Sequence, residues 1–305
     1  MNHLLSVLAL IILITPTHAS TPQVYWHAML PNAPMPRAIL DLISFDELDK
    51  DKFNVDLRYE VDALRYNGQL YVEDQVHDAP NATLFFFEKD LNPGSKFDLQ
   101  FTKMTSGSPL ISRSQANTIP FSSNKLLEIL THFQVKPMSI TAYAMNKTLV
   151  ECEMPALDGE SKLCATSLES MVEFSMMNLG TRDLQASSTM VKKKSGDVKV
   201  KKTYSVAPDG VRVLDKDELV VVCHSEQYPY TVFYCHTTGK GKSKAYTIAL
   251  EGNDGTKVEA IAVCHLDTSK WNPKHLAFQI LKVKRGRVPI CHFMPEDNVT
   301  WTIKK

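Results

Sequence analysis

The pattern of apolar and polar positions divides the chain into an apolar start, a less regular stretch and a globular remainder. Residues 4–14 form an apolar run, and the small residues Thr17 and Ala19 follow it. The run is too short to cross a bilayer comfortably, and small residues at this spacing are typical of a signal-peptidase site. We therefore predict a signal peptide at residues 1–19.

Residues 20–82 show little regular patterning. Prolines interrupt the first part, and an acidic stretch covers residues 46–51. Apolar residues alternate with polar ones only over residues 54–61, which predicts one strand. We interpret residues 20–82 as a variable leader or linker and residues 83–305 as the globular domain.

Two helices are predicted in the first half of this domain. A pair of serines can cap an apolar stripe at residues 126–133. The second helix is better marked, because Thr166 and Glu169 have the spacing of a capping box. An apolar stripe follows over residues 168–179, and Gly180 is expected to end the helix.

From residue 218 onward the pattern becomes that of a sheet. The apolar runs are short, rich in β-branched and aromatic residues, and separated by turn sequences such as residues 252–255. Together with the helices, this pattern predicts a β-rich α+β fold whose helices lie mainly in the first half of the domain.

The dipeptide Cys-His occurs four times in this second half. Each copy follows three mainly apolar residues, and spacers of ten, 27 and 25 residues separate successive copies. The histidines of the four copies are His224, His236, His265 and His292. Because neighbouring residues on a strand face opposite sides, a cysteine that faces the core leaves its histidine facing a surface or cleft. We expect a C-terminal sheet or barrel that carries four Cys-His strands and brings several imidazoles together.

Imidazoles gathered in this way predict a metal site. Neutral imidazole is a ligand for copper, zinc, iron or nickel, and copper(II) binds most strongly in the divalent series. The C-x2-C spacing of structural zinc sites is absent, and adjacent residues on a strand do not easily chelate one ion. A Cys-His catalytic dyad would leave an odd cysteine and would not explain four copies. We therefore expect these histidines to bind a metal ion, with copper favoured.

The cysteine count favours disulfides in a secreted chain, where the compartment is oxidising. The six cysteines are Cys152, Cys164, Cys223, Cys235, Cys264 and Cys291. They allow fifteen full pairings, among which the sequence does not choose. Because Cys152 and Cys164 lie outside the Cys-His copies with eleven residues between them, we expect these two to be joined and the other four to pair among themselves.

Net charge and surface motifs limit the classes of binding partner that the sequence predicts. The formal net charge is zero, which gives no footprint for nucleic acid and no general affinity for anionic membranes. Apart from the signal peptide, no segment is apolar enough to span a membrane. Asn81, Asn146 and Asn298 begin Asn-x-Thr glycosylation sequences. Six lysines lie within residues 190–202, either as a solvated loop or hairpin edge or as a patch for a polyanion such as wall pectin.

The positions of these residues resemble the defining pattern of the plant BURP domain. The four Cys-His copies and Trp301, which follows the last copy after eight intervening residues, agree with nine fixed positions of that pattern. Further segments similar to the family lie at residues 25–32, 86–94, 119–122 and 164–171. The resemblance is firm over residues 84–303, and the middle of the chain looks most like the dehydration-responsive and seed-protein branches.

The resemblance implies two kinds of function. The family includes stress-induced wall proteins, seed proteins and a non-catalytic polygalacturonase subunit. These relatives imply a secreted copper-binding protein with a structural or interaction role in the cell wall, apoplast or storage vacuole, and a wall polysaccharide as partner. Copper ligands would be drawn from the four histidines, and the adjacent cysteines would be structural.

The alternative that the resemblance implies is a copper-dependent peptide cyclase. Some family members crosslink a Tyr or Trp side chain to another residue of a core peptide, often one carried by the same chain. The mature chain contains only Trp26, Trp271 and Trp301, each within a general family motif or the domain itself. No segment resembles a core peptide, so a cyclase of this kind is expected to act on a separate peptide or at a site that the sequence does not mark.

Overall fold

The structure covers most of the domain and a segment that precedes it. A computed structural model of the chain describes residues 21–48, 85–101, 103, 108–192, 201–215 and 219–304. The signal peptide, the strand expected at residues 54–61 and most of the lysine cluster lie outside these residues. The described residues form an α+β fold that is rich in strands, as the sequence predicts.

The larger sheet has seven strands within the described residues, and the pairings within it are antiparallel. Its strands run in the order β1-β11-β10-β9-β6-β2, and β5 pairs with β10. They are β1 (Phe86–Phe87), β2 (Lys96–Leu99), β5 (Met190–Lys192), β6 (Lys202–Val213), β9 (Ser243–Gly252), β10 (Lys257–His265) and β11 (Ile290–Phe293). The turn predicted at residues 252–255 joins β9 to β10, where Gly255 adopts a positive φ of 78°.

The smaller sheet has five antiparallel strands within the same residues, in the order β3-β8-β7-β12-β4. They are β3 (Ser161–Ala165), β4 (Leu184–Ser187), β7 (Val221–Glu226), β8 (Val232–Thr237) and β12 (Val299–Ile303). A small apolar cluster joins the two sheets, with Val222 of β7 packed among Ile261 and Val263 of β10.

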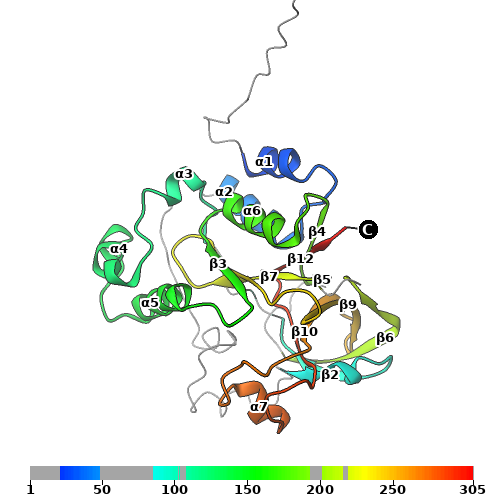
Figure 1. The fold of residues 1–305 in the computed structure, drawn as a ribbon. Coiled ribbons are helices and arrows are strands. Elements are labelled where there is room, and N and C mark those ends of the chain that lie inside the picture. The colour runs from blue at the N-terminus through cyan, green and yellow to red at the C-terminus, as the bar shows by residue number, and fades with distance from the viewer. Residues whose placement is uncertain are drawn as a thin grey trace, which may run out of the picture.

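Seven helices and two short 3-10 turns accompany the sheets within the described residues. They are α1 (Pro22–Met29), α2 (Arg37–Leu48), α3 (Arg113–Ala116), α4 (Leu126–His132), α5 (Ile140–Glu153), α6 (Leu168–Leu179) and α7 (Leu276–Leu281), with short 3-10 turns η3 (Glu88–Asp90) and η4 (Ser123–Lys125). In Figure 1, α1, α2 and α6 lie together above the smaller sheet, whereas α7 lies at the opposite end of the molecule.

The four Cys-His copies all lie on strands, but one sheet does not carry them all. The first two copies lie on β7 and β8 of the smaller sheet, and the last two lie on β10 and β11 of the larger sheet. The expected single sheet or barrel with four Cys-His strands is therefore replaced by two sheets with two such strands each. Strand alternation fixes which face a histidine takes, but it does not fix which strands pair.

The best-marked helix begins one residue later than the sequence predicts. Ser167 caps α6, and its hydroxyl accepts a hydrogen bond from the Ser170 backbone N–H. The Ser170 hydroxyl in turn accepts from the Ser167 backbone N–H. Thr166 and Glu169 have the same spacing but do not form this box. Gly180 ends the helix in the left-handed conformation, as predicted.

The stretch interpreted as a leader begins with two helices that pack into the core. Trp26 of α1 is fully buried, and its ring lies 5.5 Å from that of Trp301 on β12. The Trp26 indole N–H donates to the Ala33 carbonyl at 2.8 Å, so the buried ring keeps its hydrogen bond. Leu30 and Ile39 join the same apolar core as the smaller sheet and α6.

No helix among the described residues is long and apolar enough to cross a membrane.

Truncating Trp26 should destabilise the whole domain. Because the ring is fully buried against Trp301, Trp26→Ala should lower the free energy of unfolding by about 3–5 kcal/mol in urea. Val24→Ala, on the exposed side of the same helix, should change it by less than about 0.5 kcal/mol. Equal unfolding midpoints for the two variants would show that α1 does not contribute to the core.

Candidate histidine site

Two cross-strand disulfides organise the site. Cys223 on β7 lies directly opposite Cys235 on β8, and Cys264 on β10 lies directly opposite Cys291 on β11. Both opposed pairs are joined by disulfides. Each sheet thus contains the same unit, in which two antiparallel strands are tied at one rung and each strand has a histidine at the next position.

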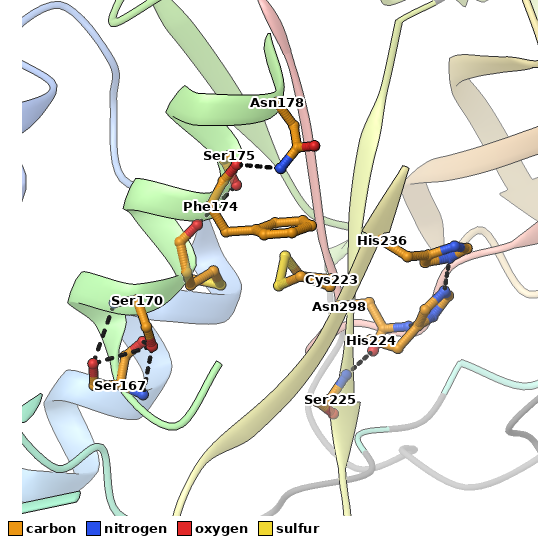
Figure 2. The surroundings of a disulfide bond; sticks show 12 residues. Ser167, Ser170, Phe174, Ser175, Asn178, Cys223, His224, Ser225, His236 and Asn298 are labelled. Atoms are coloured by element: carbon orange, nitrogen blue, oxygen red, sulfur yellow. Dashed lines mark hydrogen bonds between the residues drawn. A yellow bond between two sulfur atoms is a disulfide. The ribbon is translucent and has the colours of Figure 1, made fainter. Parts of the chain in front are cut away.

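The disulfides and histidines lie on opposite faces of each sheet. The Cys223–Cys235 disulfide belongs to the core beneath α6, and the Cys264–Cys291 disulfide belongs to the core of the larger sheet. Figure 2 shows Cys223 directed toward Phe174 of α6, with His224 and His236 on the other side of the strands. Because side chains alternate along a strand, the histidines of both sheets face the space between the sheets.

The four histidines meet in this space. Their ring centroids form a closed circuit, with 5.4 Å from His224 to His236, 6.4 Å to His265, 5.6 Å to His292 and 6.1 Å back to His224. We call these four residues the histidine cluster. The His224 and His236 rings face each other through their Nε2 atoms, which lie 3.3 Å apart.

A cavity of about 270 Å³ opens beside the histidine cluster. Aromatic side chains form part of its wall: Phe85 lies against His292, Tyr234 against His236, and Trp271 lies between His265 and His275. The loop between α5 and β3 and the loop before α7 supply further polar residues of the wall. The space is large enough for a single amino-acid side chain.

Glu160 orients His236. Its Oε1 lies 2.7 Å from His236 Nδ1, and its Oε2 accepts from the Leu157 backbone N–H at 3.0 Å. Burial by itself would raise the pKa of the Glu160 carboxyl, but the hydrogen bond and charge of His236 outweigh it and lower that pKa below its ordinary value. The side chain is therefore a carboxylate at neutral pH and holds one ring nitrogen of His236 in place.

Asn298 orients His224. Its Oδ1 accepts from the Ser225 backbone N–H at 3.0 Å, and its Nδ2 lies 3.0 Å from His224 Nδ1 (Figure 2). Asn298 directly precedes β12, whose Val299 is paired with Cys223, so it lies beside His224 in the sheet. His265 has a weaker partner, the Ser243 hydroxyl at 3.4 Å from its Nδ1.

Burial keeps three of the four rings uncharged. Desolvation, reinforced by neighbouring histidines, lowers the pKa of His224 and His265 well below 6.5. Desolvation also lowers the pKa of His292 to about 4. These three rings are neutral at pH 7, so each has a nitrogen lone pair that can accept a proton or bind a metal ion.

Burial also shifts the pKa of one basic and one acidic group beside the cluster, Lys162 and Glu151. Desolvation lowers the pKa of Lys162, whose Nζ donates to the Glu151 carbonyl at 2.8 Å and lies 5.1 Å from the Tyr234 ring centroid. Desolvation raises the pKa of the Glu151 carboxyl. The Lys162 Nζ thus lies over an aromatic ring beside the histidine cluster.

The structure places every predicted cysteine in a disulfide within the described residues. Cys152 is joined to Cys164, as the spacing suggested, and closes a loop that contains Glu160. The other four cysteines pair across strands.

The predicted glycosylation positions differ in their surroundings. Asn81 lies outside the described residues, and Asn146 is half-buried on α5. Asn298 is buried, and its Nδ2, the atom that would carry a glycan, contacts His224. Glycosylation at the three positions stays a prediction.

The sequence did not mark Glu160, Asn298 or Trp271 as site residues. Asn298 was noted only as part of a glycosylation sequence, and Glu160 lies 64 residues before His224 with no local motif. The only available indication was the pair Cys152 and Cys164, because a disulfide-closed loop constrains what lies within it. These residues reach the site through tertiary packing alone.

The four histidines do not yet form a closed coordination group. Among the side chains that the structure describes, no three histidine, cysteine or acidic groups are arranged to hold a metal ion. The rings therefore lie together as separate donors, with hydrogen-bond partners on the protein side and the cavity on the other.

Comparison with known proteins agrees with the sequence pattern. Residues 84–303 match the family model described as the BURP domain. The chain is similar to BURP domain-containing protein 5 of Oryza sativa subsp. japonica, with 43% identity over 288 residues, 93% of this chain and 87% of that protein.

Two further relatives are longer than the matched region. BURP domain-containing protein 3 of the same rice is 51% identical over 230 residues, which cover 75% of this chain and 53% of that protein. BURP domain protein RD22 of Arabidopsis thaliana is 46% identical over 232 residues, 75% of this chain and 58% of that protein. The chain thus spans little more than half the length of these two.

Acid should destabilise the metal-free domain through its buried histidines. The unfolded chain binds more protons than the folded one between about pH 4 and 6.5, so the free energy of unfolding falls as pH falls through 6.5. For His292 the loss from pH 7.5 to 5.5 is about 1 kcal/mol. In urea with a chelator, His292→Gln should therefore lose about 1 kcal/mol less over this interval than the wild type.

The matched control is His132→Gln, an exposed ring on α4 that should leave the acid loss unchanged. If His292→Gln and the wild type lose the same stability on acidification, His292 is not held neutral by burial.

Proposed function

Since the chain belongs to the BURP-domain family of plant proteins, we propose that it is a secreted protein that binds a copper ion with its histidine cluster. Its role is structural or interactive, in the cell wall, the apoplast or a storage vacuole, during stress or seed development. A wall polysaccharide is the partner that this location and the lysine-rich stretch favour.

The observation that carries the proposal is the meeting of two identical units at one place. Each sheet directs two histidines into the gap between the sheets, and the four rings close into one circuit beside a cavity. Imidazoles are costly to gather away from water unless something uses their lone pairs, because a desolvated polar group must be satisfied. A metal ion with a preference for imidazole satisfies them together.

The residues present fit copper in donor type, because neutral imidazole nitrogen is a ligand for copper. The His236 Nε2 atom lies at the cavity, 3.3 Å from that of His224. A site that included His236 would draw its further donors from His265 or His292, whose rings also border the cavity.

An ion held from both sides would fasten the two sheets together. His236 belongs to the smaller sheet and His265 to the larger, and the small apolar cluster around Val222 joins the two sheets. A ligand that binds the folded state alone stabilises it, by about 2.7 kcal/mol at a concentration 100-fold above its dissociation constant. This gives copper a structural role without any reaction.

The three disulfides support a secreted location. They are stable in the oxidising space outside the cell or along the secretory route, and thiols stay reduced in the cytosol. Each of the two cross-strand bonds fixes the strands from which the histidines project. A protein that must hold its histidines in register outside the cell benefits from both.

The cavity favours a second candidate function, a copper-dependent cyclase that joins Tyr or Trp side chains of a peptide. The space beside the histidines has the volume of a side chain and aromatic walls at Tyr234 and Trp271, which suit another ring. Bound copper would supply one-electron oxidation with dioxygen as the oxidant. The neutral histidines would accept the proton of a phenol or indole, and the cavity wall would limit the access of water.

Copper binding should depend on histidines from both sheets. In calorimetric titration of the metal-free protein, His236→Ala and His265→Ala should each weaken copper(II) binding by at least about 10-fold, because each removes a donor. Copper(II) should also raise the urea midpoint of the wild type. His132→Ala, which removes an exposed ring on α4, should bind as the wild type does. Equal weakening by all three variants would contradict a site in the histidine cluster.

The cyclase function is tested by mass spectrometry of peptides exposed to the copper-loaded protein. After incubation with copper(II), air and a synthetic peptide that contains Tyr and Trp, digested peptides are mapped for the loss of two hydrogen atoms per new bond, with dioxygen reduced to hydrogen peroxide. A crosslink formed by the wild type and lost in His236→Ala would support the enzyme. Copper-loaded protein that leaves its own peptides and a panel of added peptides unchanged would leave the structural role as the function.

A further inference from the structure

The hydrogen bonds around His224 and His236 permit one set of proton positions. The Asn298 amide is fixed first, because the Ser225 N–H needs an oxygen as its partner, so Asn298 turns Oδ1 toward Ser225 and Nδ2 toward His224. An amide nitrogen only donates. His224 Nδ1 must therefore accept, and a neutral His224 ring carries its proton on Nε2.

The opposite assignment follows at His236. The Glu160 carboxylate only accepts, so His236 Nδ1 must carry a proton to make its 2.7 Å contact. The Nε2 atoms of the two rings lie 3.3 Å apart, and the proton between them comes from His224. His236 Nε2 is thus an acceptor with a lone pair. Along the series Asn298–His224–His236–Glu160, each hydrogen bond then has one donor and one acceptor.

Glu160 cannot be replaced by its amide without disturbing this order. Its two oxygens accept from two donors, the Leu157 backbone N–H and the His236 Nδ1–H. The Leu157–Glu160 turn is held by the backbone bond from Glu160 N–H to the Leu157 carbonyl and lies in the loop closed by Cys152–Cys164. An amide at position 160 has only one oxygen for the two donors.

We infer that Glu160 and Asn298 are positioning residues with opposite effects. Glu160 makes His236 the first ligand of the metal site, whereas Asn298 keeps the proton of His224 on Nε2 and so prevents this nitrogen from binding metal. Metal binds the ring nitrogen that has no proton, and a carboxylate on the other nitrogen is the arrangement that orients such a ligand. His236 meets this condition before metal arrives. His224 meets it only after its proton moves from Nε2 to Nδ1, which breaks its contact with Asn298.

This asymmetry specifies the kind of site. In the smaller sheet, His236 is ready to bind a metal ion through Nε2. His224 stays a hydrogen-bond donor whose Nε2–H points toward that nitrogen. An ion anchored by His236 and the histidines of the larger sheet would keep one position open beside the cavity, as metal sites that receive an exogenous ligand do. The inference rests on the proposed copper site, but the proton positions are tested without copper.

The first test is nitrogen NMR of the metal-free, ¹⁵N-histidine-labelled protein at pH 8. We expect the His236 proton on Nδ1 and the His224 proton on Nε2 in the wild type. Asn298→Asp should move the His224 proton to Nδ1, because a carboxylate accepts from both Ser225 and His224. Two rings with the same proton position in the wild type would overturn the inference, with no variant required.

The second test is copper(II) affinity. Glu160→Gln should weaken binding by roughly 10–100-fold, and Asn298→Asp should strengthen it by about 10-fold. Glu153→Gln is the control for lost charge, since this exposed carboxylate lies in the same disulfide-closed loop and contacts only Ser122 and Ser123 among the hydrogen bonds shown. Asn272→Asp is the control for added charge at the cavity rim, where its oxygen keeps its bond to the Lys274 N–H.

The outcomes separate the two proposals. Effects of the same sign for Glu160→Gln and Asn298→Asp, or an Asn272→Asp effect as large as that of Asn298→Asp, would overturn the inference while copper binding stands. Failure of the wild type to bind copper(II), with the expected NMR pattern, would overturn the copper site and leave the proton order as a property of the fold.

Discussion

The rung formed by two opposed cysteines is the constraint on which the site depends. Cys223 faces Cys235 and Cys264 faces Cys291, and each disulfide is buried in the core on the outer side of its sheet. Because a strand alternates its faces, the next residue cannot point the same way. Each disulfide therefore sends two histidines toward the opposite sheet, and a slip of one residue in either strand would bury them on the wrong side.

The two sheets then make one site from two half-sites. Val222 and Val263 lie on the same faces as the histidines and pack the sheets together, so the distance between the half-sites is set by apolar contact. Helices α6 and α1, the latter through Trp26, pack against the face of the smaller sheet opposite the histidines. The strands that carry the histidine cluster are thus supported from the core on both sides.

The sequence was informative where the physics is local. Alternation predicted the opposite faces of cysteine and histidine, and the glycine after residue 179 predicted the end of α6. Pairing between distant strands is not local, so the division of the four strands between two sheets was not predictable. Trp26 was assigned to a leader because its partner, Trp301, is 275 residues away. Glu160 and Asn298 reach the histidines in the same nonlocal way.

The most direct test of the account is anomalous diffraction at the copper edge from crystals of the metal-free protein soaked in copper(II). The account predicts one strong peak between the sheets, within bonding distance of His236 Nε2 and of at least one histidine from β10 or β11. A peak at exposed histidines such as His27 or His132, with none between the sheets, would contradict it.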